Sequence, residues 1–217
     1  MRSTTTAVAH TLMAAVLALC AAAPSAAQNA DAEAASDAGV DAVATIDNLH
    51  AALLEIMQNA ESLGYGGRRD RIAPIVEASF DLAFITRFTL GRYWADLSAE
   101  QQNIMVDALR RLTIANYASR FDGYSGERFA TVSNKAARKG RELVRTVLEV
   151  NNDIADNVTL DYLLQQTEGS WRIVNVIANG VSDLSLKRAD YGAVVKTQGL
   201  DSLIARINGQ IAELETE

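Results

Sequence analysis

Cysteine and histidine are nearly absent from this sequence. Its single cysteine, Cys20, and one of its two histidines, His10, both precede Gln28, so His50 is the only residue of either kind beyond that point. The chain after Gln28 therefore excludes a disulfide, a cysteine nucleophile and a Cys/His zinc cluster. A Ser-His-Asp arrangement would depend on His50, which lies one step off the apolar side of its predicted helix and is interpreted as a rim residue without a chemical role.

Basic residues are also fewer than acidic residues. The chain has 20 Lys and Arg against 27 Asp and Glu, a formal net charge of −7. Nucleic-acid binding draws its affinity from a basic surface, so this balance argues against it. No carboxylate pair, nucleophile or glycine-rich loop has a spacing that defines a catalytic or metal site. The sequence therefore predicts a protein that is not an enzyme and that uses no cofactor or metal.

The sequence has one continuous apolar run, and it lies at the N-terminus. Ala7 to Ala23 is a short apolar run, followed by small residues up to Ala27. The run is shorter than the roughly 20 apolar residues of a membrane-spanning helix, so residues 1–27 are predicted to be a cleaved secretory signal. Lipid attachment at Cys20 is disfavoured because Leu19, the residue before it, is not small.

The rest of the chain is expected to form one domain. Residues 28–39 contain no large apolar group and are predicted to be disordered. With 49% hydrophobic residues in the whole sequence, residues 40–215 are sufficient for a single domain with a sizeable core.

Helical periodicity dominates the first half of this domain. Apolar residues recur at three- and four-residue steps from Val40 to Leu63, which predicts a helix that stops at Gly64. A second helical segment covers residues 69–79. Ser98, with Gln101 three residues later, forms a capping-box pattern and predicts the start of a long helix.

Beyond Gly126 the apolar period changes to two. Four segments alternate in this way and are joined by short polar turns, which predicts antiparallel strands. These segments are residues 128–133, 143–150, 158–164 and 171–177. Helical periodicity returns over residues 184–197 and 200–214. The predicted class is α+β: a helical N-terminal half packed on a curved four-stranded antiparallel sheet, followed by C-terminal helices.

The segment between these helices is rich in aromatic residues. Phe80, Phe84 and Phe88 are spaced four apart, which predicts one aromatic stripe along a helix that faces the sheet. Complete closure of that interface would give an ordinary packed core, whereas partial closure would leave an apolar cavity for a ligand. The spacing alone is compatible with both.

The first predicted β-hairpin is basic in an otherwise acidic protein. Its cations are Lys135, Arg138, Lys139, Arg141 and Arg145. They are interpreted either as a solvated hairpin tip or as a docking surface for an acidic partner or an anionic membrane.

An ordered set of motifs resembles the MlaC, or toluene-tolerance, family of periplasmic phospholipid-binding proteins. The set covers residues 43–207 and includes Phe80-Asp81-Leu82, Phe88 to Trp94, Leu97-Ser98 with Gln101, Leu112, Tyr117 to Phe121, Trp171 to Ser182, Arg188 and Gly199 to Ile204. Asn175 departs from the acidic residue that many relatives are expected to have there. That difference weakens a charged role at this position and leaves the lipid interpretation intact.

The resemblance implies a function in lipid transport. Such a protein would be a monomeric periplasmic shuttle that approaches membranes transiently and maintains the lipid asymmetry of the outer membrane. Its expected partners are phospholipid, an inner-membrane ABC transporter complex and an outer-membrane lipoprotein–porin complex. Two alternatives remain open: a hopanoid-associated carrier of the same family, and a small-ligand enzyme or binder on a cone-shaped α+β fold that uses a buried carboxylate such as Asp161.

The expected site residues form two groups. Those expected to line an apolar lipid cavity between helices and sheet are Phe80, Phe84, Ile85, Phe88, Trp94, Ile104, Leu112, Tyr117, Val144, Leu148, Tyr162 and Ile173. Those expected to dock partners are Lys135, Arg138, Lys139 and Arg141.

Overall fold

The computed structural model describes residues 26–150 and 157–216, with side chains from Ala42 onward. Its helices are α1 (Ala26–Gln58), α2 (Ala60–Ser79), α3 (Leu82–Leu90), the 3-10 helix η1 (Gly91–Asp96), α4 (Ala99–Arg120), α5 (Asp183–Gln198) and α6 (Leu200–Leu214). Its strands are β1 (Arg128–Ala137), β2 (Arg141–Glu149), β3 (Val158–Thr167), β4 (Ser170–Ala178) and β5 (Val181–Ser182). Over these ranges, no helix has both the length and the apolar content needed to cross a bilayer. The predicted signal peptide lies almost entirely outside the described residues.

The strands form one antiparallel sheet in the order β1-β2-β3-β4-β5, so each strand pairs with the next along the chain. This confirms the predicted α+β class and the four predicted strands. The fifth strand, β5, has only two residues and pairs with the end of β4. A segment of that length shows no alternation, which is why the sequence did not reveal it.

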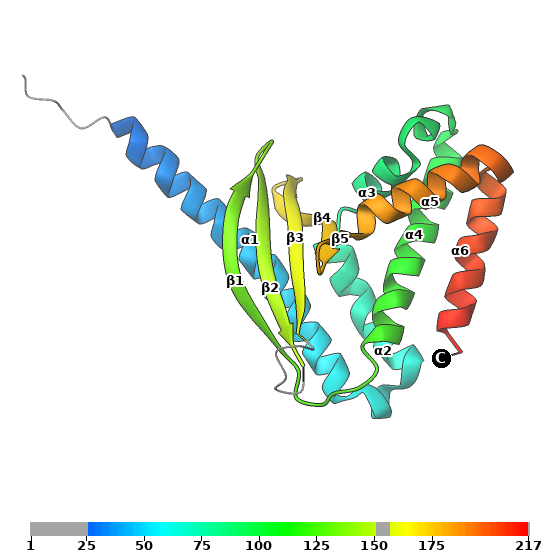
Figure 1. Cartoon of the computed structure of the whole chain (residues 1–217), viewed down its shortest axis with the longest axis horizontal. Helices are drawn as coiled ribbons and strands as arrows, with labels where there is room; N and C mark the ends of the chain where they lie inside the picture. The colour runs from blue at the N-terminus through cyan, green and yellow to red at the C-terminus, as the bar shows by residue number, and fades with distance from the viewer. Residues whose placement is uncertain (1–25, 151–156, 217) are drawn as a thin grey trace, which may run out of the picture.

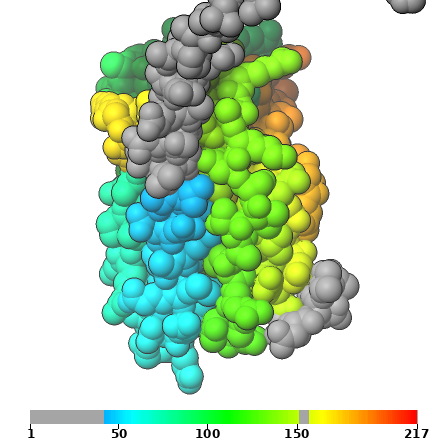
Figure 2. All heavy atoms as spheres, turned by 90° about the vertical axis from the view of Figure 1, so that its left-hand side faces the viewer, coloured from blue at the N-terminus to red at the C-terminus, as the bar shows by residue number. Residues whose placement is uncertain are grey.

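One face of the sheet packs against α1. Val144 and Thr146 point to this face by the alternation of β2, and both are fully buried. Tyr162 of β3 is the register partner of Val144 and reaches His50 of α1. Figure 2 shows the described part of α1 lying alongside β1 and β2. The remaining helices extend the core sideways: α4 packs against both α2 and α6, on the side of the molecule away from β1 (Figure 1).

The N-terminal helix differs from the expectation in two ways. The backbone of residues 28–39 is helical and forms the first part of α1, although disorder was predicted there. Alanine is frequent in this segment and has the highest helix propensity of all residues. The predicted helix over residues 40–63 is also divided, because α1 ends at Gln58 and α2 begins at Ala60. The domain boundary near residue 40 stays a prediction.

The backbone leaves helical geometry at Gly64, where the helix was predicted to stop. Gly64 has φ 57° and ψ 179° within α2. Residues with a side chain rarely adopt this conformation, so glycine is required at this break. The start of α4 is also confirmed, since Ser98 and Gln101 form both reciprocal hydrogen bonds of a capping box.

Asp81 fixes the start of α3 and ties it to the sheet. One carboxylate oxygen accepts a 2.8 Å hydrogen bond from the Phe84 backbone N–H. The other accepts hydrogen bonds from Thr167 Oγ1 at 2.8 Å and Gln165 Nε2 at 3.1 Å, both on β3. The Asp81 backbone N–H donates to the carbonyl oxygen of Ile173 on β4. A single residue thus serves as a helix cap and as a link to two strands.

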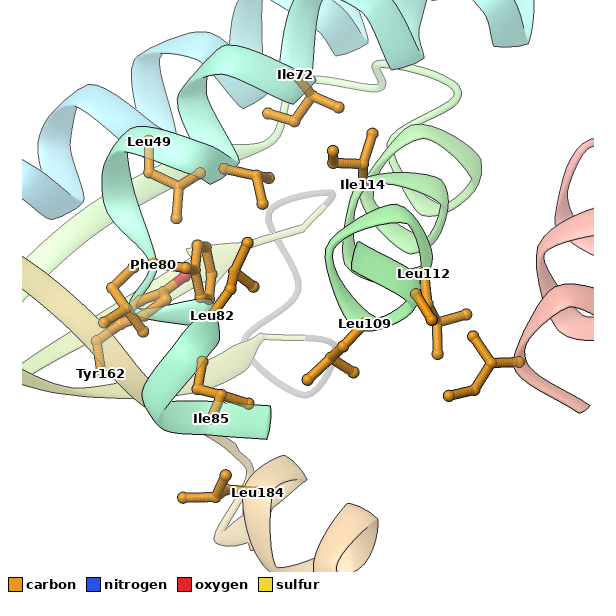
Figure 3. Close-up of a cluster of buried hydrophobic side chains, with 14 of the residues drawn as sticks. Leu49, Ile72, Phe80, Leu82, Ile85, Leu109, Leu112, Ile114, Tyr162 and Leu184 are labelled. Atoms are coloured by element: carbon orange, nitrogen blue, oxygen red, sulfur yellow. The ribbon is translucent and has the colours of Figure 1, made fainter. Parts of the chain in front are cut away.

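The core is one continuous cluster of buried apolar side chains between the sheet and the helices. Figure 3 shows Phe80, Leu82 and Tyr162 within this cluster, while Leu112 points from α4 toward the C-terminal helices. The cluster includes residues from α1 to α6 and from β2 to β4, so the chain from Ala42 onward shares a single core.

We expect Asp81→Ala to lower the free energy of unfolding by about 1–3 kcal/mol, because it removes a helix cap together with the hydrogen bonds to β3. Urea denaturation followed by circular dichroism measures this change. Ser98→Ala is the matched control, since it removes an exposed helix cap that has no bond to the sheet. Equal losses for the two variants would contradict a linking role for Asp81.

Candidate functional site

The three phenylalanines of the predicted stripe do not share one helix. Phe80 precedes α3 in an extended conformation, with φ −107° and ψ 143°, and forms a parallel bridge with Ile173. The helix that holds Phe84 and Phe88 starts only at Leu82 because Asp81 caps it. The continuous stripe that was expected from the spacing is therefore interrupted after its first ring.

Phe80 belongs to the buried interior. It is 7% exposed and meets Tyr117 of α4 edge to face, with 5.9 Å between ring centroids. Other residues of the predicted cavity lie in the same cluster: Ile85, Leu112, Val144, Tyr162 and Ile173 are buried, and Trp94 and Tyr117 pack against them half-buried. The structure thus brings most of the predicted lining residues into one apolar region between α3, α4 and the sheet.

Ile104 and Leu148 lie outside this cluster of buried residues, and Leu112 lies where the cluster meets the C-terminal helices. Leu112 lines a pocket of about 360 Å³ between α4, α5 and α6, together with Tyr191 and Leu214. Ile104 is 45% exposed on α4. Leu148 is half-buried near the end of β2, opposite Phe129 of β1.

Phe84 and Phe88 lie at the edge of the apolar region. Their rings stack with centroids 6.0 Å apart and an interplanar angle of 24°, and Phe88 is 38% exposed. The Arg141 guanidinium carbon lies 5.1 Å from the Phe84 centroid, and that of Arg87 lies 5.9 Å from it. The Arg188 guanidinium carbon lies 4.7 Å from the Phe88 centroid. We call these five residues the arginine–phenylalanine surface.

Arg188 is held in place at the end of α3. Its Nη1 donates a hydrogen bond to the Phe88 carbonyl oxygen, one of the acceptors that the helix end leaves unpaired. Gly91, with φ 57°, provides the room: a Cβ there would come within 3.1–3.3 Å of the guanidinium. This contact joins α5 to α3 across 100 residues of sequence, and no sequence pattern indicated it.

The basic hairpin divides into exposed and engaged cations. Lys135, Arg138 and Lys139 are exposed near the β1-β2 turn. Arg141 is half-buried against Phe84 and donates to Gln165 Oε1 at 3.0 Å. Arg145 forms a two-bond ion pair with Asp161, its cross-strand partner, at 2.6 and 2.8 Å. The buried carboxylate considered above, Asp161, is therefore held in an ion pair with Arg145.

His50 forms a buried polar contact beneath the sheet. It is 4% exposed, its Nε2 lies 3.0 Å from the Tyr162 hydroxyl, and its ring stacks on Phe129 at 3.9 Å between centroids. Burial holds the pKa of Tyr162 well above its ordinary value, so the group that pairs with Nε2 is a protonated hydroxyl. Burial also lowers the pKa of His50 to about 4, so the imidazole is neutral. The interpretation of His50 as a rim residue is thus wrong. The helix pattern placed it one step off the apolar side, but Tyr162 and Phe129 of the sheet enclose its ring.

The chain belongs to the MlaC family. The family's sequence model, described as MlaC protein, matches residues 47–209, which confirms the resemblance seen in the motifs. A similar solved structure is that of a phospholipid-binding protein from Ralstonia solanacearum in complex with a phospholipid. It is 22% identical in sequence, and the match has a TM-score of 0.67 and covers 80% of this chain and 98% of that chain. At this level of identity the likeness shows a common fold.

We expect the stability of the protein to fall as the pH decreases from about 6.5 to about 4 because of His50. Its pKa in the folded protein lies below the value of 6.5 that applies to the unfolded chain, so the unfolded state takes up a proton first. The loss should reach about 3 kcal/mol and then level off below the folded pKa. Comparing urea denaturation of the wild type and His50→Gln across this range isolates the contribution of His50 from that of the carboxylates.

The same residue can be observed directly. His50 is the only histidine after residue 27, so the protein without residues 1–27 should show a single imidazole titration by NMR. A midpoint near the ordinary histidine value would show that His50 is solvated and would contradict the buried contact with Tyr162.

Proposed function

We propose that this protein is a periplasmic carrier that binds a phospholipid and moves it between the outer and inner membranes. The observation that carries the proposal is the family match over residues 47–209. The fold shared with a phospholipid-binding protein supports it, as does the large apolar region between the helices and the sheet. A predicted secretory signal over residues 1–27 is consistent with a periplasmic location.

Burial of acyl chains is sufficient to explain the affinity of such a carrier. Each buried methylene contributes about 0.8 kcal/mol, so long acyl chains supply ample free energy without a charged contact. We propose that the chains enter the apolar region around Phe80, Tyr162 and Ile173, and that Phe84 and Phe88 form its rim, where the head group meets solvent. Head-group selectivity should then be small.

Delivery of the lipid would require partners in both membranes. We propose an inner-membrane ABC transporter complex and an outer-membrane lipoprotein–porin complex, and hence a role in maintaining outer-membrane lipid asymmetry. The exposed cations of the hairpin, Lys135, Arg138 and Lys139, are suited to orienting the acidic protein toward acidic partner surfaces.

Native mass spectrometry of protein purified from cells tests the proposed function. A bound phospholipid is expected. A bound hopanoid would assign the protein to the hopanoid-associated branch, and a ligand-free protein that turns over a small molecule would favour the enzyme alternative.

Phe84→Asp should lower the amount of co-purified phospholipid at least several-fold while the protein stays folded. The side chain is half-buried at the rim, so the carboxylate can reach water in the free protein but would oppose an acyl chain beside it. Mass spectrometry gives the lipid occupancy, and circular dichroism reports folding. Tyr124→Asp is the control, because Tyr124 is an exposed aromatic in the α4–β1 connection. Unchanged lipid occupancy in Phe84→Asp would remove this residue from the lipid site.

Charge reversal of Arg138 and Lys139 together should slow lipid delivery to the purified transporter complex without changing the amount of bound lipid. Both residues are exposed and lie beyond the apolar region, so they act on the approach of the protein rather than on lipid retention. The effect should be largest at low salt, because charges are screened over about 10 Å at 0.1 M. Delivery that is unaffected at every salt concentration would exclude the hairpin from docking.

A further inference from the structure

The arginine–phenylalanine surface has an uncompensated positive charge. Among the described residues, none of the ion pairs involves Arg87, Arg141 or Arg188. The carboxylate of Asp81, at the start of α3, accepts hydrogen bonds from the Phe84 backbone, Gln165 and Thr167 and forms no ion pair with these arginines. Three guanidiniums therefore stand together without an acidic partner on a protein whose net charge is −7.

The surface is also continuous with the basic hairpin. Arg141 follows the β1-β2 turn directly and lies over Phe84, so it joins the hairpin to α3. Lys139 and Arg138, two and three residues earlier, are exposed in the turn. The exposed Phe88 ring stands at the centre of this positive region, between Phe84 and Arg188.

We propose that the arginine–phenylalanine surface is the face by which the protein docks on a bilayer that contains anionic phospholipid. The proposal rests on the proposed function, because a lipid carrier must come close to a membrane or to a complex embedded in one. The docking proposal goes further, because it specifies the face of the protein that contacts the membrane and the negative charge of the lipid that this face binds.

The chemistry of the surface matches the head-group region of such a bilayer. Guanidinium groups bind phosphate through paired hydrogen bonds, and juxtamembrane cations are attracted to an anionic leaflet. An exposed apolar ring beside cations can insert at the boundary between head groups and acyl chains, because the buried apolar area adds to the electrostatic attraction. Phe88, 38% exposed and flanked by Arg188, presents this combination.

The structural contacts of these arginines do not exhaust their bonding capacity. Arg188 uses Nη1 for the Phe88 carbonyl, and Arg141 uses Nη2 for Gln165, but a guanidinium has several further N–H donors. The contacts with the phenylalanine rings, the Phe88 carbonyl and Gln165 hold the guanidinium groups in position. This reduces the entropy lost when a phosphate binds. Arg87 is exposed and forms no side-chain hydrogen bond with the described residues, so its N–H donors remain free to bind phosphate.

Sedimentation with phospholipid vesicles tests the docking surface in the mature protein. We expect binding to vesicles that contain phosphatidylglycerol, little binding to vesicles of phosphatidylcholine alone, and a decrease as salt is raised. Arg87→Glu and Phe88→Ala should each weaken binding to the anionic vesicles, the charge reversal by about tenfold at low salt. Inorganic phosphate added to the same mixtures should compete poorly, since it supplies the anion without the interface.

Two variants at the other end of the molecule serve as matched controls. Arg120→Glu reverses a last-turn arginine of α4, as Arg87→Glu does in α3, so both have the same unfavourable helix-end interaction. Tyr124→Ala removes an exposed aromatic ring, as Phe88→Ala does. Arg120 ends α4 and Tyr124 lies in the α4–β1 connection, and Figure 1 shows this part of the chain at the bottom of the molecule and α3 in its upper half. Both controls should bind anionic vesicles as the wild type does.

Three results would overturn the proposal. These are absence of binding to anionic vesicles, equal binding to neutral ones, or an equal loss in the two controls. If the wild-type protein does not bind vesicles but Arg87→Glu slows delivery to a detergent-solubilised transporter complex, the surface contacts a protein instead of a bilayer. Lipid occupancy, measured by mass spectrometry, distinguishes the carrier function from the docking surface. Arg87→Glu should retain its phospholipid. A wild-type protein without bound lipid would contradict the carrier function but would not change the result of the vesicle experiment.

Discussion

The position of α3 depends on the contacts of Asp81 with the sheet. Its carboxylate caps the helix and accepts hydrogen bonds from Thr167 and Gln165, and its backbone N–H pairs with Ile173. These bonds turn the chain out of the extended conformation of Phe80 and start a new helix immediately afterwards. As a result one aromatic ring enters the core while the next two reach the rim.

That division gives the apolar region an inside and an edge. Phe80 and Tyr162 are buried within the apolar cluster between the helices and the sheet. Phe84 and Phe88 are stacked on each other and bordered by arginines, so their faces contact cations as well as carbon. The apolar interior is suited to acyl chains, and the cationic, aromatic rim is suited to the head-group layer of an anionic bilayer. This arrangement connects the proposed carrier function to the proposed membrane face.

The sheet is fixed to α1 by a different kind of contact. His50 and Tyr162 satisfy each other's polar atoms within an apolar layer, and Phe129 covers the imidazole. A hydrogen bond of this kind costs little when it is complete and much when one partner is charged or removed. We therefore expect the contact between α1 and the sheet to weaken when His50 is protonated in acid.

The sequence by itself determined most of the elements and their order. The alternation of Val144, Thr146 and Leu148 defined a strand, and Ser98 with Gln101 defined a helix start, because such signals depend on residues that are neighbours along the chain. Only the tertiary structure decided which side chains share a site. The bridge of Phe80 to Ile173, the contact of Arg188 with Phe88 and the burial of His50 under Tyr162 each join residues about 90 to 110 positions apart. Local periodicity carries no information on such pairs, because the packing of whole elements against one another sets them.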